Sequence, residues 1–353
     1  MKILYAGNFD LSGYTGKNRA TRQKLQALTA LVDELKFFSV NCKPRLFGLL
    51  VTELKCFAYI LRQRPDIFIS RGNIGLLSVC LCKLLKCKTF REIHADRIEE
   101  INLLNKSEIF KSVLKLIALY TLMIDRLADA RIFNHPLLKD WYDATYGCGP
   151  LDFYCYNGFA QTKMQALDKK DILAKYKKSH GLSDNYRYLI FTGSASQWHG
   201  VEYLVALQGQ LNQNNSDLKI ICAGGRVGPE IDPQRLLINI SPLDDQGSDE
   251  LISIASACLL PVNNRRVSPG SPLKLYDYIK HGGFVITQEQ VLGYCDEVQK
   301  YGRGVCVNFL DAAATAQRLM DLDFTATIAT PIAHYSWQAR MNTWLDVFKK
   351  VIV

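Results

Sequence analysis

The sequence lacks the cysteine spacing by which several classes of protein are recognised. Eleven cysteines are present, but no C-x-x-C pair occurs, and Cys80 and Cys82 have one residue between them. Without such spacing, a structural zinc site and a disulfide framework are both disfavoured in a chain of this length. Several cysteines, including Cys56, Cys80, Cys222 and Cys258, fall in apolar segments. We therefore expect buried, reduced thiols and a cytosolic protein.

Long apolar runs are also missing. The longest, Val113–Ile124, is interrupted by Lys115 and falls short of the roughly 20 residues that a helix needs to cross a bilayer. Met1 and Lys2 lead directly into a short apolar strand, so no amino-terminal signal peptide is visible. These absences predict a protein that is soluble or bound peripherally to a membrane.

Common nucleotide and metal motifs are absent as well. The glycine-rich segment Gly7–Gly16 is neither G-x-G-x-x-G nor a Walker A loop, because no glycine stands five residues before Gly16 and Asn18 replaces the Ser or Thr. It is either a loop that closes on a ligand or a simple turn. The only D-x-D, Asp321–Asp323, follows a helix rather than a strand, which disfavours a metal-bound diphosphate there. No metal site is expected.

What the chain does contain is a globular composition with an uneven charge. The chain of 353 residues is long enough for two domains. The composition, 48% hydrophobic and 22% charged, is typical of globular proteins and disfavours disorder. Residues 1–160 hold 23 Lys and Arg against 15 Asp and Glu, whereas residues 161–353 hold 20 against 19. A basic first half fits an anionic membrane surface or a phosphorylated substrate, and nucleic acid is not expected because no nucleic-acid-binding signature accompanies it.

Both halves alternate short apolar strands with longer amphipathic helices, a pattern that predicts parallel α/β layers. We expect doubly wound domains at 1–160 and 161–330, a polar junction at 159–178 and a terminal helix within 331–353. The expected strands are 3–5, 67–70, 88–93, 130–133, 153–155, 188–192, 219–223, 236–240, 257–261 and 283–287. The expected helices are 18–31, 46–62, 75–85, 108–127, 136–146, 200–212, 248–256, 272–281, 312–320 and 335–351.

The most informative segment is 267–287, VSPGSPLKLYDYIKHGGFVIT. Ser271 fits the N-cap of a helix and Pro272 its first position, which would place Lys274 in the first turn, beside N–H groups without intrahelical partners. A glycine pair would end the helix before the next strand. A helix start of this kind is a candidate phosphate site, and a lysine that is merely solvated is the alternative.

Three further strand ends carry residues suited to ligand binding. His94, within Arg91–Asp96, would face the ligand-binding edge of a parallel sheet, and a structural histidine is the alternative. Glycine turns follow two strands at Gly193–Ser194 and Gly225–Arg226, where small residues would let a ligand approach the backbone, although either could be a bare turn. With Lys274 at the same edge, the combination favours a diphosphate ligand.

This assembly resembles a GT-B glycosyltransferase, most of all the large retaining family 4, over nearly the whole chain. Four segments carry the likeness: 155–158 (CYNG), 191–204 (FTGSASQWHGVEYL), 271–278 (SPLKLYDY), and 335–337 with the last helix. The resemblance implies two Rossmann-like domains that face a central cleft. The first would bind the acceptor, the second the nucleotide sugar, and the C-terminal helix would cross back onto the first.

The resemblance also implies contacts for individual residues. Lys274 and the backbone around it would meet the diphosphate, Asp277 would hold the ribose hydroxyls, and His94 would contact the donor sugar near its reacting carbon. The residues implied to be catalytic are thus His94 and Lys274. Those implied to bind the nucleotide sugar are Gly13, Gly16, Gly193, Ser194, His199, Gly225, Arg226, Gly270, Ser271, Leu273 and Asp277.

Four positions depart from the family pattern. Asp277 stands in place of the family's second glutamate, which shortens the reach of the carboxylate by one methylene group. Pro269 stands where the family has its first glutamate, so the carboxylate contact to the sugar hydroxyls is missing or comes from elsewhere. Ser194 and His199 stand in place of the usual Arg and Lys pair, which leaves the cationic cradle to the first-turn lysine and to Arg226 or Arg265. The phosphate end of the donor is therefore better specified than the sugar end.

The resemblance implies a retaining, metal-independent transfer of a hexosyl group from a UDP- or GDP-linked sugar, with no further cofactor. Lys106, Lys111 and Lys115 surround an apolar helix and favour a polyprenyl-diphosphate-linked acceptor at the inner face of the membrane, in bacterial capsule, exopolysaccharide or O-antigen synthesis; a solvated helix face is the alternative. Two other interpretations stay open: a catalytically impaired nucleotide-sugar-binding subunit or scaffold, and a nucleotide-sugar epimerase.

Overall fold

The computed structural model describes residues 1–9, 11, 16–40, 45–161, 168–195, 198–289, 293–325 and 328–352. The chain forms two compact units, which are described separately. The first comprises Met1–Ala160, Ser268–Ser271 and Ser336–Val353, and the second comprises Gln161–Val267 and Pro272–Tyr335.

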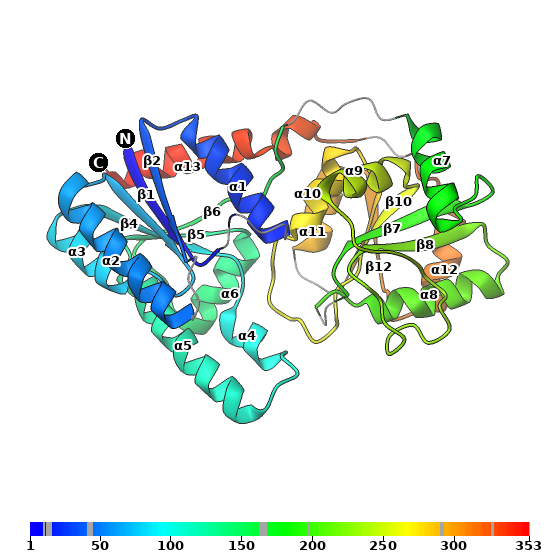
Figure 1. Ribbon diagram of the computed structural model, residues 1–353, viewed down its shortest axis with the longest axis horizontal. Coiled ribbons are helices and arrows are strands. Elements are labelled where there is room, and N and C mark those ends of the chain that lie inside the picture. The colour runs from blue at the N-terminus through cyan, green and yellow to red at the C-terminus, as the bar shows by residue number, and fades with distance from the viewer. Residues whose placement is uncertain are drawn as a thin grey trace. The chain divides into compact units, whose positions relative to one another are not determined.

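The first unit is built on a six-stranded sheet in the order β2-β1-β3-β4-β5-β6, in which every pair of neighbours is parallel (Figure 1). Parallel strands need crossover connections, and helices of this unit supply them. The strands are β1 (Lys2–Gly7), β2 (Glu34–Ser39), β3 (Ile67–Arg71), β4 (Lys88–Ile93), β5 (Ala130–Phe133) and β6 (Asp152–Tyr154). The helices are α1 (Gly16–Thr29), α2 (Arg45–Gln63), α3 (Leu76–Leu84), α4 (Arg97–Asn102), α5 (Glu108–Leu127), α6 (Pro136–Tyr146) and α13 (Trp337–Ile352).

Successive side chains of β1 enter different cores on the two faces of this sheet. Ile3 and Tyr5 pack with α1 and α13, whereas Leu4 and Ala6 pack with α2, α3 and α5. This alternation follows from the two-residue period of a strand. The last helix supplies Trp337, Met341, Trp344 and Phe348 to the first of these cores, so the C-terminal segment is part of the first unit.

The second unit contains another six-stranded parallel sheet, in the order β12-β11-β10-β7-β8-β9 (Figure 1). Its central strands are buried on both faces, which explains their nearly continuous apolar sequences. The strands are β7 (Arg187–Gly193), β8 (Leu218–Gly224), β9 (Ile238–Ile240), β10 (Ala257–Leu260), β11 (Val285–Gln288) and β12 (Gly304–Val307). The helices are α7 (Lys169–His180), α8 (Val201–Gln213), α9 (Asp245–Ile254), α10 (Leu273–Lys280), α11 (Tyr294–Tyr301), α12 (Ala312–Met320) and the 3₁₀ turn η1 (Ile332–Tyr335).

The predicted pair of parallel α/β sheets is confirmed, and the two units divide between Ala160 and Gln161, within the predicted junction at 159–178. The junction is not all linker. Helix α7 begins within it, after Asp168, whose side chain accepts a hydrogen bond of 2.8 Å from Lys170 N. It ends at Gly181, which has a positive φ of 70°. Only Ile172 and Tyr176 of this helix are buried, so its lysine-rich sequence concealed it. The elements β2, α4, α11 and β12 were not predicted either.

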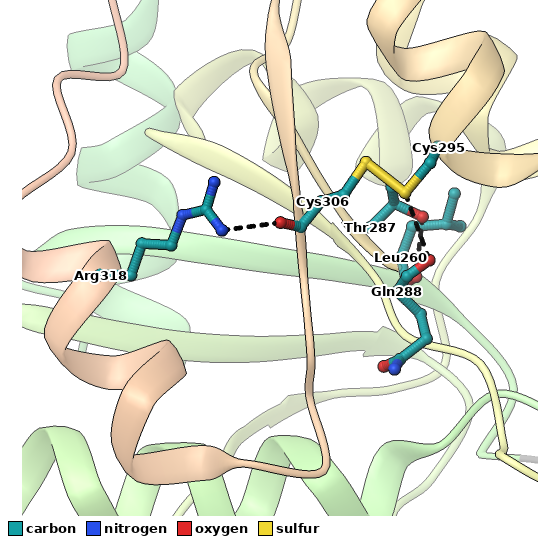
Figure 2. Close-up of a disulfide and its surroundings, with 6 residues drawn as sticks. All are labelled: Leu260, Thr287, Gln288, Cys295, Cys306 and Arg318. Carbon is teal, nitrogen blue, oxygen red and sulfur yellow. Dashed lines mark hydrogen bonds between the residues drawn. A yellow bond between two sulfur atoms is a disulfide. The ribbon is translucent and has the colours of Figure 1, made fainter. Parts of the chain in front are cut away.

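The expectation that all thiols are buried and reduced is also wrong. Cys295 in α11 and Cys306 in β12 form a disulfide with Cα atoms 5.8 Å apart (Figure 2). Cys80 and Cys148 are free but exposed. The pairing could not be predicted because it depends on α11 lying against β12, two elements that the sequence pattern did not reveal.

Candidate functional site

Helix α10 begins one residue later than the sequence predicts. Pro272 occupies the N-cap position with extended backbone angles, and no side chain caps the helix. The assignment of Ser271 as the cap is therefore wrong: the carbonyl of Ser271 accepts a hydrogen bond of 2.7 Å from Asn157 Nδ2. The N–H groups of Leu273 and Lys274 open the helix and have no intrahelical acceptor.

Lys274, in the first turn of α10, carries a buried amino group. Its Nζ lies 3.9 Å from the centre of the Phe191 ring, and an added Cβ on Gly193 would lie 2.5 Å from Lys274 Cε. Among the residues that the structure describes, none accepts a hydrogen bond from Nζ. Burial lowers the pKa of Lys274 well below 10.5, and the opposing influence of Cys222 and Asp277 does not cancel it. An anionic acceptor would satisfy this group.

Two glycine turns lie beside Lys274 because the strands before them are paired. The last residues of β7 and β8, Gly193 and Gly224, stand opposite each other in register and have positive φ of 133° and 108°. Gly225 N donates a hydrogen bond of 2.9 Å to Gly193 O. A Cβ on Gly225 would lie only 2.5 Å from Ser194 Cα, so the two turns pack backbone against backbone. A ligand that approached these turns would meet their backbone.

His199 ties the first turn to the residues that follow it. Its Nδ1 lies 2.7 Å from Ser194 O, and because a carbonyl only accepts, Nδ1 carries the proton. The His199 ring also packs edge-on against Phe191, with centroids 5.8 Å apart. Burial, reinforced by the charge of Lys274, lowers the pKa of His199 to about 3. The imidazole is therefore neutral at physiological pH and adds no positive charge.

Tyr278 fixes α10 against the sheet. Its hydroxyl accepts a hydrogen bond of 3.1 Å from Thr192 N in β7 and donates one of 3.1 Å to Leu259 O in β10. Since Tyr278 lies four residues after Lys274, on the same side of the helix, these bonds hold the lysine against Phe191.

In the first unit, His94 belongs to a buried ionic cluster that the sequence analysis missed. The carboxylate of Glu92 accepts hydrogen bonds from Lys24 Nζ, from the Tyr5 hydroxyl and from His94 Nε2. Arg71 Nη1 lies 3.9 Å from the same carboxylate. The available signal was Glu92 itself, a charged residue inside a buried strand, which requires a cationic partner.

The charge states in this cluster follow from burial. Burial lowers the pKa of Lys24 to about 8 and, together with Arg71, that of His94 to about 3. Burial alone would raise the pKa of Glu92, but Lys24, the hydrogen bond from His94, and Arg71 outweigh it and hold the pKa well below 4.5. The result is an ionised carboxylate beside a neutral imidazole whose Nε2 is the protonated nitrogen. The remaining nitrogen, Nδ1, is a hydrogen-bond acceptor. A small cavity lies beside the cluster, lined among others by Lys24, Glu92, His94, Asn134, Asn157 and Trp344.

The structure brings only part of the predicted donor set together. Gly193, Ser194, His199, Gly225 and Lys274 lie at one edge of the second sheet, Leu273 and Asp277 share the helix of Lys274, and Arg226 is exposed beside Gly225. Gly16, His94, Gly270 and Ser271 belong to the first unit, and Gly16 is exposed at the start of α1. Gly13 lies outside the described residues. Within the described part of the chain, no three His, Cys, Asp or Glu side chains cluster as metal ligands would.

Comparisons with known proteins identify the fold of this chain through solved structures alone. No family model matches the sequence, and no curated protein does. Among solved structures, the chain is similar to sucrose-phosphate synthase from Thermosynechococcus elongatus, at a TM-score of 0.73 and 15% identity over 99% of both chains. It is similar to a glycosyltransferase from Rickettsia africae, at a TM-score of 0.69 and 14% identity, over 99% of this chain and 98% of that one. It is also similar to Anabaena HepE in complex with UDP and glucose, at a TM-score of 0.67 and 13% identity over 99% of both chains. The chain therefore has the GT-B glycosyltransferase fold.

Proposed function

We propose that this protein is a glycosyltransferase that moves a sugar from a nucleotide-diphosphate sugar to a hydroxyl of a glycan or lipid-linked acceptor. The observation that carries the proposal is Lys274. Its amino group is buried, has no hydrogen-bond acceptor among the described residues and lies at the uncapped start of a helix, beside two glycine turns. A diphosphate supplies the negative charge and the acceptor oxygens that such a site lacks.

The chemistry asked of this site is stabilisation of a leaving group. In the proposed reaction, the bond between the anomeric carbon and the phosphate oxygen breaks, and the acceptor oxygen bonds to that carbon. The acceptor proton passes to the departing diphosphate, with retention of configuration and without a metal ion. Lys274 and the first N–H groups of α10 would stabilise the charge that develops on the diphosphate, and preorganised groups of this kind are often the largest contribution to catalysis.

The remaining roles are proposed for individual side chains. Asp277 would bind the ribose hydroxyls of a UDP- or GDP-linked donor. The Nε2–H group of His94 donates its hydrogen bond to Glu92. Nδ1 would therefore accept a hydrogen bond from a sugar hydroxyl. The proposed acceptor is a polyprenyl-diphosphate-linked glycan of bacterial surface polysaccharide synthesis, used at the inner face of the membrane.

The test is a thermal-shift screen of the purified protein with UDP-, GDP- and ADP-sugars, followed by product analysis. A ligand at about 100 times its Kd stabilises the folded state by about 2.7 kcal/mol, which raises Tm by several degrees. We expect such a shift for one nucleotide class and its loss in Lys274→Ala. If no nucleotide shifts the wild type, or if Lys274→Ala responds equally, the proposed phosphate site is wrong.

A second candidate is a nucleotide-sugar-binding subunit without turnover. It is favoured by Pro269, which is buried and offers no carboxylate where the resembled family has one. Binding of a nucleotide without transfer or hydrolysis, across a panel of donors and acceptors, would support it. Interconversion of sugar nucleotides with no acceptor present would instead indicate an epimerase.

A further inference from the structure

Helices α2, α3 and α5 cover one face of the first sheet (Figure 1). Their outward side carries many exposed hydrophobic side chains. Helix α3 contacts both α2 and α5. Thirteen of the twenty large hydrophobic side chains that are exposed in the described part of the chain lie on these three helices, although the helices make up a small part of the protein. The most exposed are Leu84 and Ile109, both at 81%, Leu116 at 67% and Phe47 at 57%. We call this outward side the α2–α3–α5 face.

Helix α5 contributes a continuous stripe to this face. Ile109, Val113, Leu116, Tyr120 and Met123 are all exposed and are separated by alternating steps of four and three residues. Residues at these steps lie on one side of a helix, so the stripe extends along about four turns. Stripes of this kind normally face a core. Here the opposite side of α5 is already buried within the first unit, at Ala118 and Asp125.

The acidic groups of these helices are mostly turned inward. Glu53 accepts hydrogen bonds of 2.9 Å from Gly75 N and Ser78 N at the start of α3. Asp125 is buried and accepts one of 2.6 Å from Arg91 Nε. The remaining acid of the three helices in the described chain, Glu108, is exposed and pairs with Lys111.

The basic groups of the same helices stay at or near the surface. The α2–α3–α5 face is thus apolar, with cations around and among its hydrophobic side chains and one exposed carboxylate. The cations with described side chains, besides Lys111, are Lys55, Arg62, Lys83, Lys115 and Arg126.

We propose that the α2–α3–α5 face docks on the surface of an anionic lipid bilayer. Apolar side chains would enter the boundary between headgroups and acyl chains, while lysine and arginine would meet lipid phosphates, each contributing by roughly a factor of five to partitioning. A protein partner fits less well, because it would have to supply acidic groups to match cations distributed over three helices. None of the described helices has the length and apolar composition needed to cross a membrane. The proposal deepens the proposed function and rests on it in one respect, because it gives the surface by which a transferase would reach a lipid-linked acceptor. It does not involve Lys274 or its surroundings.

The test is co-sedimentation of the full chain with vesicles. We expect binding to vesicles of phosphatidylglycerol and phosphatidylethanolamine, little binding to phosphatidylcholine, and release at high salt. Ile109→Gln/Leu116→Gln and Lys55→Glu/Arg62→Glu should each lower the partition coefficient about tenfold or more. All four side chains are exposed, so the variants should unfold at the temperature of the wild type.

Matched variants test whether vesicle binding depends on this face or on exposed hydrophobic and basic residues in general. Val267→Gln/Leu310→Gln removes exposed apolar residues of the second unit, and Lys178→Glu/Lys349→Glu makes the same charge change elsewhere. Both should bind vesicles as the wild type does. The proposal is overturned if the wild type ignores anionic vesicles, if the controls lose binding as strongly as the face variants, or if Ile109→Gln/Leu116→Gln instead converts a dimer to a monomer. The nucleotide thermal shift, measured on the same variants, reports separately on the proposed transferase site.

Discussion

At the scale of single residues, the buried position of Lys274 destabilises the folded protein but suits it to bind an anion. A buried amine without an acceptor among the described residues opposes folding, since its charge must be desolvated or given up. Lys274→Met keeps the aliphatic stem against Phe191 and removes the amine. We predict that it raises the free energy of unfolding by about 1–3 kcal/mol and abolishes the nucleotide-induced shift, as measured by urea denaturation with and without ligand.

The matched control for this prediction is in the last turn of the same helix. Lys280 Nζ pairs with Asp249 at 2.7 Å, so Lys280→Met should be neutral or destabilising by up to about 1 kcal/mol and should keep the nucleotide response. A loss of stability in Lys274→Met would mean that the amine has a favourable partner without ligand, and the argument for an anion site would fail.

The pair Lys24–Glu92 shows the opposite situation, in which each buried charge satisfies the other. Glu92→Gln leaves the Lys24 ammonium without a carboxylate, and Lys24→Met leaves Glu92 without its main cation. We predict that each single change destabilises the protein by about 3–5 kcal/mol and that the double variant is far less destabilised than their sum. A double-mutant cycle by chemical denaturation measures this, and additive effects would show that the pair is not coupled.

At the scale of the elements, the attachment of α10 to β7 decides where Lys274 lies. Tyr278→Phe removes the acceptor of Thr192 N, and we predict a loss of about 1–3 kcal/mol in stability together with a several-fold weaker affinity for nucleotide. Tyr276 is the control, because it is also buried on α10 but donates its hydroxyl proton to Glu297. Tyr276→Phe should lower stability and leave affinity unchanged, as read by ligand titration. Equal losses of affinity would show that α10 responds as a whole.

Predictability also varies from element to element. The bounds of α5 and α6 were predicted to the residue, because their apolar residues recur regularly and their ends carry caps or proline. Helix α7 buries only two residues and β2 none completely, so neither has a strong pattern. Lys274 could be selected because its helix start is local in sequence. Glu92 could have been noticed as a charged residue in a buried strand, but its partners could not be predicted, because they come from β1, α1 and β3 and meet it only in the folded chain.

At the scale of the whole molecule, two histidines in different units should make stability depend on pH in the same way. The pKa values of His94 and His199 are lowered to about 3, whereas an unfolded histidine titrates near 6.5. Below about pH 6.5 the unfolded chain takes up protons that the folded protein resists, so stability is full above that pH and falls as pH decreases toward 3. Between pH 7 and pH 5, the two histidines together should lower the free energy of unfolding by about 2–4 kcal/mol, after allowance for their partial solvent exposure.

The pH dependence can be assigned with replacements that keep the polar contact. His94→Gln can still donate to Glu92, and His199→Asn can still donate to Ser194 O, but neither takes up a proton. We predict that the double variant loses most of the difference in unfolding free energy between pH 7 and pH 5, measured by denaturation at both values. His334→Gln, at an exposed histidine, should retain the wild-type difference. If the double variant is as sensitive to acid as the wild type, Glu92 and the other carboxylates rather than these imidazoles cause the loss, since the lowered pKa of Glu92 acts in the same direction near pH 4.5.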